Sequence, residues 1–70
     1  MYCYIFELVG ESFEIPRDEV LSILLSNNFQ LSSFYNIKKF LFVFIPKNKI
    51  DENKRFFLRE EFKNIVSFTR

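Results

Sequence analysis

The chain has 70 residues, of which 49% are hydrophobic, 20% aromatic and 27% charged, and its formal net charge is +1. This length fits one small domain over residues 1–70, and the apolar content excludes a disordered chain. Histidine is absent and Cys3 is the single cysteine, so the chain supplies no zinc ligand set and no internal disulfide, and we expect neither a metal nor a cofactor.

The first third of the chain predicts a strand and a helix. Alternating side chains over residues 2–9 predict the strand, and Gly10 ends it. Its two faces are Tyr4, Phe6 and Leu8 on one side and Cys3, Ile5, Glu7 and Val9 on the other. Pro16 suits the first turn of a helix, and Asn27 and Asn28 suit its exit, so we expect the helix over residues 16–27.

A short antiparallel hairpin is expected next, from strands over residues 30–35 and 40–45. In the second strand, Phe40, Phe42 and Phe44 share one face and Leu41, Val43 and Ile45 share the other. Asn36 is the expected turn residue. Pro46 ends the second strand because proline has no backbone N–H to donate to a sheet.

The last third predicts a helix and a closing strand. Asp51 suits the N-cap of a helix over residues 52–62, and apolar residues within 64–69 indicate a strand. The resulting order predicts a ferredoxin-like α+β fold, βαββαβ, in which an antiparallel sheet carries two helices on one face. One longer helix over the last third is the alternative.

Charge is distributed unevenly, with a net charge of −4 over residues 1–35 and +5 over residues 36–70. Cations interleaved with aromatic side chains can neutralise phosphates and stack bases. The candidate RNA contacts are Lys38, Lys39, Lys47, Lys49, Lys54 and Arg55. The plainer interpretation is that these cations solubilise the hairpin, because a net charge of +1 is small for a nucleic-acid-binding chain.

Carboxylates and the cysteine offer little chemistry. Glu11, Glu14, Asp18 and Glu19 gather around the start of the first expected helix. Paired carboxylates can act as acid and base, but the helix dipole explains Asp18 and Glu19 without any reaction. Cys3 lies on an apolar strand with no neighbouring cation, as a packed thiol does. We therefore predict no catalytic residue, and no enzyme in this chain by itself.

The phenylalanines, 11 in number, indicate an interface. Strands over residues 2–9 and 40–45 are apolar on both faces, and a small domain does not normally leave that much contiguous apolar surface in water. The candidate interface residues are Tyr4, Phe6, Phe40, Phe42 and Phe44. We expect another domain, a partner chain or a second copy to cover one face of the sheet.

No apolar run approaches the roughly 20 residues that span a bilayer. The first four residues also lack the basic start of a signal peptide. We expect no membrane contact and a cytoplasmic location.

Residues 4–24 resemble the beginning of the archaeal THUMP-containing tRNA guanosine-N2 methyltransferases, which methylate guanosine at position 10 of tRNA. The matching residues are Phe6-Glu7-Leu8, Gly10-Glu11 and Glu19-Val20. Pro16 departs from the pattern, since a small residue is expected there. Residues 34–45 and 57–68 follow the family in order, without diagnostic residues.

In that family, a ferredoxin-like N-terminal domain and the THUMP domain hold the tRNA, while a later domain binds S-adenosylmethionine and carries the catalytic motif. The resemblance therefore implies a non-catalytic, RNA-positioning accessory domain or split subunit, with tRNA and a THUMP-containing methyltransferase protein as partners. The alternative is a self-associating interaction module without an RNA role, which forms a homodimer through the Phe-rich sheet face. A small viral or plasmid protein with a coincidental similarity is a third interpretation.

Overall fold

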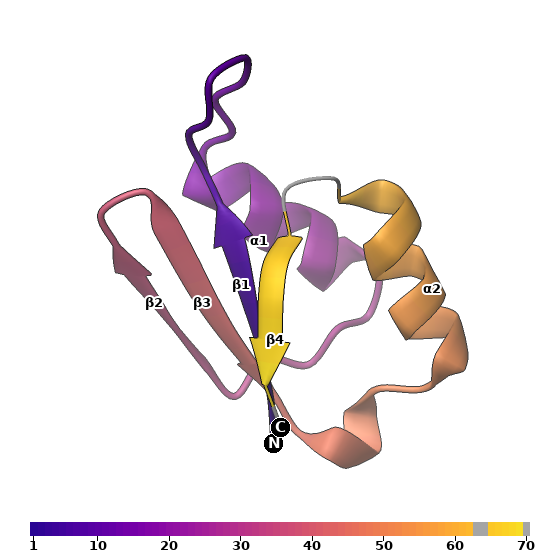
Figure 1. The fold of residues 1–70 in the computed structure, drawn as a ribbon. Helices are drawn as coiled ribbons and strands as arrows, with labels where there is room; N and C mark the ends of the chain where they lie inside the picture. Colours follow the sequence, from indigo (N-terminus) through magenta and orange to yellow (C-terminus); the bar gives the residue numbers. More distant parts are fainter. Residues whose placement is uncertain (63–64, 70) are drawn as a thin grey trace.

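The computed structural model describes residues 1–62, Ile65 and the backbone of residues 66–69. Its elements in chain order are β1 (Tyr2–Glu7), α1 (Arg17–Ser26), β2 (Ser33–Ile37), β3 (Phe40–Ile45), the 3-10 turn η1 (Lys47–Lys49), α2 (Glu52–Glu61) and β4 (Ile65–Thr69). The strands form an antiparallel sheet in the order β2-β3-β1-β4, and both helices lie behind it on one face (Figure 1). The α+β class, the antiparallel pairing of β1, β3 and β2, and the two helices are confirmed.

The register of β1 against β3 places the core on the helix side of the sheet. Tyr4 lies opposite Val43, and Phe6 lies opposite Leu41. The expected alternation within β1 and within β3 is confirmed, because one face of each of these two strands is buried under the helices. The buried core consists of Tyr4, Phe6, Leu8, Val20, Leu24, Phe29, Leu41, Val43, Ile45, Ile50, Leu58 and Phe62.

Helix α1 begins and ends close to where the sequence predicts. Pro16 occupies the N-cap position rather than the first helical turn. At the other end, Asn28 has a positive φ of 65°. The Phe29 N–H donates to the Leu24 carbonyl at 3.0 Å, and the Asn28 N–H donates to the Leu25 carbonyl at 3.2 Å. This is the Schellman arrangement with asparagine in the left-handed position, and it turns Phe29 back into the core.

Helix α2 has the expected N-cap. The Asp51 carboxylate accepts a hydrogen bond from the Lys54 backbone N–H at 2.8 Å. This bond satisfies one of the four N–H groups that the first turn of a helix leaves without an intrahelical partner.

Replacing this cap has a measurable cost. We expect Asp51→Ala to lower the free energy of unfolding by about 1 kcal/mol, because the Lys54 N–H loses its acceptor. Asp51→Ser, which keeps a side-chain oxygen, is the control and should recover most of that loss. Urea unfolding followed by circular dichroism measures both, and equal losses in the two variants would mean that the cap contributes nothing.

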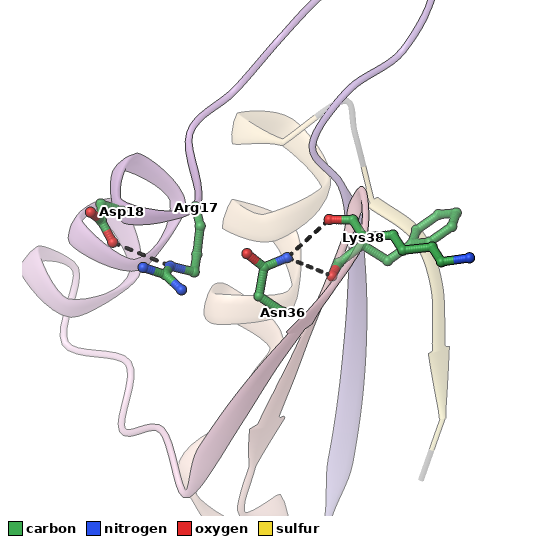
Figure 2. A network of polar contacts seen from close by, with 5 residues as sticks. Arg17, Asp18, Asn36 and Lys38 are labelled. Atoms are coloured by element: carbon green, nitrogen blue, oxygen red, sulfur yellow. Dashed lines mark hydrogen bonds and ion pairs between the residues drawn. The ribbon is translucent and has the colours of Figure 1, made fainter.

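The hairpin between β2 and β3 differs from the prediction. The turn consists of Lys38 and Lys39, not Asn36, and β2 lies three residues later than expected at its start. Lys38 takes the positive φ, 53°. The Asn36 side-chain amide instead donates to the carbonyls of Lys38 at 3.3 Å and of Phe40 at 3.1 Å, as Figure 2 shows. Asn36 thus supports the turn from the strand beside it, which explains why its position misled the prediction.

The closing strand was expected over residues 64–69, and residue 64 lies outside the described residues. The backbone of β4 pairs with β1, with a shift in register between Ile5 and Phe6. Helix α2 ends at Glu61, so the alternative of one longer helix is wrong. Among the described residues, neither helix is long and apolar enough to cross a membrane.

Candidate functional site

The side of the sheet that faces away from the helices is the candidate site, and we call it the open face. The register aligns alternate positions of β1, β3 and β2 on this side. Its members are Cys3, Ile5 and Glu7 of β1, Phe40, Phe42 and Phe44 of β3, and Ser33, Tyr35 and Ile37 of β2.

The open face is apolar at its centre. Phe40, Phe42 and Phe44 are half-buried, although they belong neither to the core nor to the apolar side chains packed against it. Tyr35 and Ile37 flank them and are 59% and 56% exposed. The Tyr35 ring meets the Phe44 ring edge-on, with the ring centroids 5.9 Å apart. Tyr35 and Phe44 therefore shield each other in part, and neither helix covers the open face (Figure 1).

The charged groups at one end of the open face pair with each other. The Lys39 ammonium lies 3.0 Å from a Glu7 carboxylate oxygen and 5.4 Å from the centroid of the Phe40 ring. The two opposite charges cancel beside the hairpin turn. An incoming surface therefore meets a nearly neutral row of aromatic side chains.

Two residues of the predicted interface do not lie on the open face. Tyr4 is 7% exposed and Phe6 is fully buried on the helix side. The Phe6 ring packs edge-on against the Phe62 ring, with the centroids 5.0 Å apart. The sequence predicts one interface made of Tyr4, Phe6 and the phenylalanines of β3, but the register sets Tyr4 and Phe6 beside the aliphatic face of that strand. The structure therefore removes Tyr4 and Phe6 from the candidate interface.

Tyr4 is a core residue with a shifted titration. Burial raises the pKa of its hydroxyl above the ordinary value of 10.0. The positive charge of Arg55 partly offsets this shift, and Tyr2 raises the pKa slightly further. The neutral hydroxyl is thus favoured by folding. Because the folded-state pKa is the higher one, this contribution to stability is complete below pH 10.0 and is lost as the pH rises through the folded-state pKa.

Alkaline titration tests this placement. We expect the free energy of unfolding to fall as the pH rises above about 10, and Tyr4→Phe to show a shallower fall because it has no proton to lose there. Urea unfolding between neutral pH and about pH 11 measures both chains. Tyr35→Phe, at an exposed tyrosine, is the control and should keep the wild-type slope; a Tyr4→Phe slope equal to wild type would contradict the burial effect.

The six candidate RNA contacts lie at two ends of the molecule. Lys38 and Lys39 form the turn that begins β3, whereas the other four follow the opposite end of that strand, in η1 and the first turns of α2 (Figure 1). Six residues of β3 separate the two groups. The structure thus keeps Lys47, Lys49, Lys54 and Arg55 in one region and places the two turn lysines elsewhere.

A polar hollow lies in the η1–α2 region. Its volume is about 230 Å³, and it is lined by Asn28, Gln30, Asn48, Lys49, Ile50, Asp51 and Lys54. The Lys54 ammonium lies 5.7 Å from the centroid of the Phe29 ring. On the next position of α2, the Arg55 guanidinium lies 5.2 Å from the Tyr2 ring centroid and donates to the Tyr2 hydroxyl. Of the two lysines that line the hollow, Lys54 is thus placed beside an aromatic ring, whereas Arg55 lies outside the lining and is held by Tyr2.

The carboxylates and the cysteine show no reactive arrangement in the part of the chain that the structure describes. Asp18 and Glu19 lie in the first turn of α1, where they complement the helix dipole. Arg17 and Asp18 form an exposed pair at 3.4 Å, visible in Figure 2, and such surface pairs add little to stability. Cys3 is a buried free thiol. Within the same part of the chain, no three acidic or cysteine side chains are placed to hold a metal ion.

Sequence reasoning missed Tyr35 and Ile37 as members of the site. The prediction ended β2 at residue 35 and put the turn at Asn36, which removed Ile37 from the strand. The alternation of Tyr35 and Ile37 around Asn36 is the signal that points to a strand through these residues.

No protein-family model, no curated protein and no solved structure matches this chain. The open face and the η1–α2 hollow therefore have to be interpreted from their own chemistry.

Proposed function

We propose that the chain is a non-catalytic docking domain that joins another protein surface through its open face. The observation that carries this proposal is the row of Phe40, Phe42 and Phe44, which is half-buried without any helix above it. Aromatic side chains bury the most area per residue and are enriched at the centres of protein interfaces. The Glu7 carboxylate at one end of the row is paired with Lys39, so a partner that covers the face does not bury an unpaired carboxylate there.

The resemblance favours a tRNA guanosine-N2 methyltransferase system as the setting. In this role the chain is an accessory domain or split subunit that docks onto a THUMP-containing protein. The strand order β2-β3-β1-β4, with β1 and β3 at the centre, supports the ferredoxin-like assignment on which the resemblance depends. A second copy of the chain is the alternative partner of the open face.

One pair of variants tests docking through the open face. Phe42→Ser should weaken binding to a THUMP-containing protein from the same genome by at least about tenfold, because the central ring of the interface is lost. Phe56→Ser, at a phenylalanine of α2 that is 59% exposed, is the matched control and should bind as the wild type does. Titration calorimetry measures both, after circular dichroism has shown that each variant is folded.

The proposal fails if the wild-type chain binds neither that protein nor itself. It fails equally if Phe42→Ser binds as tightly as Phe56→Ser. Sedimentation of the chain alone identifies the second copy as partner, since a homodimer that Phe42→Ser dissociates would show the open face in contact with itself.

RNA positioning is the second candidate function, and the η1–α2 hollow favours it. Lys49 and Lys54 line this hollow together with amide side chains that can contact phosphates and bases. Asp51, also in the lining, would repel a phosphate on one side. A phosphate of a bound RNA would therefore have to lie on the side of Lys49 and Lys54, away from Asp51.

Salt dependence separates this candidate from docking alone. If tRNA binds at the hollow, Lys49→Ala and Lys54→Ala should each reduce the slope of log affinity against log salt by about one. Lys38→Ala, at the other end of the molecule, is the control and should leave the slope unchanged. Fluorescence titrations with tRNA at several salt concentrations measure this; equal effects of all three substitutions would indicate a non-specific cationic contact.

A further inference from the structure

Among β1, β2 and β3, the strands whose side chains the structure describes throughout, β2 is the least covered. It lies at the end of the strand order, and all five of its residues are exposed. Phe34, on the helix side, is 44% exposed, while Tyr35 and Ile37 on the open face are more exposed still. The helices therefore do not reach over this strand, and its apolar side chains meet water on both faces.

The outer edge of β2 also carries unpaired backbone groups. The turn between β2 and β3 has two residues, and Ile37 and Phe40, which flank it, form a hydrogen-bonded pair. Along an antiparallel ladder, hydrogen-bonded and non-hydrogen-bonded pairs alternate, so the pairs of Asn36 and Phe34 with β3 are non-hydrogen-bonded. The backbone N–H and C=O groups of Phe34 and Asn36 consequently point away from β3, toward the free edge.

We propose that β2 of one copy pairs antiparallel with β2 of a second copy, around a two-fold axis at Tyr35. Phe34 of each copy then lies opposite Asn36 of the other, and all four outward groups on each strand find partners. The two sheets become one continuous sheet, with the open faces of both copies on the same side. This inference concerns the edge of the sheet and does not depend on what docks on the open face.

The chemistry of β2 favours its own copy as the occupant. A strand paired with itself about a two-fold axis offers each outward N–H a carbonyl, so its hydrogen bonding is self-complementary. The sequence of β2, Ser-Phe-Tyr-Asn-Ile, contains no charge that would repel a second copy, whereas protected edge strands usually carry lysine or proline. Because five residues bury less than a standard interface, we expect a weak dimer with a Kd of about 10–100 µM.

Amide exchange tests the pairing residue by residue. On raising the concentration until about nine-tenths of the chain is dimeric, the exchange rates of the Phe34 and Asn36 amides should fall about tenfold. The Tyr35 amide, which is directed at β3, should change little. Equal protection along the whole strand, or none in a sample that sedimentation shows to be dimeric, would overturn the edge pairing.

Two substitutions test the pairing of β2 with β2 through their effect on the affinity of the dimer. Tyr35→Lys places two like charges side by side at the two-fold axis, and Phe34→Pro removes an outward N–H without breaking the ladder to β3. Each should weaken the dimer at least about tenfold, while Phe56→Lys, at a side chain as exposed as Tyr35, should leave it unchanged.

Sedimentation velocity over a concentration series measures these dimers. A wild-type chain that keeps the 8.6 kDa mass of one copy up to about 1 mM overturns the inference. A dimer that Phe42→Ser dissociates, and that Phe34→Pro on the helix side leaves intact, shows instead that the open face is the contact; Tyr35 belongs to both surfaces, so Tyr35→Lys does not separate them. Failure of the edge pairing is thereby distinguished from failure of the docking proposal.

Discussion

A Phe6→Ala variant is expected to lose about 3–5 kcal/mol of the free energy of unfolding. Phe6 is fully buried near the end of β1 and packs edge-on against Phe62. Truncation at this position removes a ring from a core to which the sheet and both helices contribute, and leaves a cavity. A domain of this size is stabilised by about 4–10 kcal/mol in total, so the loss is comparable with the whole stability.

The same substitution on the open face is the control. Phe42 lies opposite Ile5, on the side of the sheet without helices. Since its ring is only half-buried, we expect Phe42→Ala to cost about 1 kcal/mol. Urea unfolding measures both variants, and Phe6→Leu provides a milder truncation if Phe6→Ala does not fold. An equal loss at both positions would place Phe42 in the core and remove the basis for docking through the open face.

This contrast shows how far the strand patterns could be predicted. Alternation within β1 and within β3 is visible in the sequence, because each strand separates two sets of side chains. The register between the two strands decides which alternate side chains of β1 share a face with which alternate side chains of β3. The sequence of either strand alone does not determine this register. Tyr4 and Phe6 were therefore assigned to the same interface as the phenylalanines of β3, although the register places them on opposite sides.

The predicted position of the hairpin turn was wrong for a different reason. Asparagine is the usual residue for a left-handed turn position, and Asn36 was chosen on that ground. In the structure a lysine, Lys38, takes this conformation, and Asn36 contributes through its side-chain amide instead. The same preference predicted the exit of α1 correctly, because Asn28 does adopt the left-handed conformation there. Caps defined by short-range hydrogen bonds, at Asp51 and at Asn28, are thus predictable where the cap residue itself makes the bond.

The sequence indicated that the candidate site would be an apolar surface, but it identified only some of the residues that form it. The excess of phenylalanine indicated a surface that needs a cover, and Phe40, Phe42 and Phe44 remain in it. The exposure of Tyr35 and Ile37 follows from helices that stop short of β2, which is a property of the packing and not of any local pattern. The cations spread over two ends because β3 separates Lys39 from Lys47.

The second large loss is expected at a residue that lies outside both helices. Phe29 is 3% exposed and follows the left-handed Asn28 at the exit of α1. Its ring lies 5.7 Å from the Phe57 ring of α2, centroid to centroid, and the Lys54 ammonium approaches its face. Phe29→Ala should therefore cost about 3–4 kcal/mol, because it removes the hydrophobic contact of the helix end and the packing between the two helices.

A double-mutant cycle isolates the contact between the helices. Phe57→Ala alone should cost less than Phe29→Ala, since Phe57 is only partly buried, and the two rings should be coupled by about 0.5–1.5 kcal/mol. Phe56→Ala, one residue away and 59% exposed, is the control and should show no coupling with Phe29→Ala. If the losses at Phe29 and Phe57 simply add, then the two rings do not stabilise each other, and Phe29 contributes through its burial among the other core residues. Coupling, in contrast, would mean that α1 and α2 stabilise each other on the face of the sheet opposite the proposed docking surface.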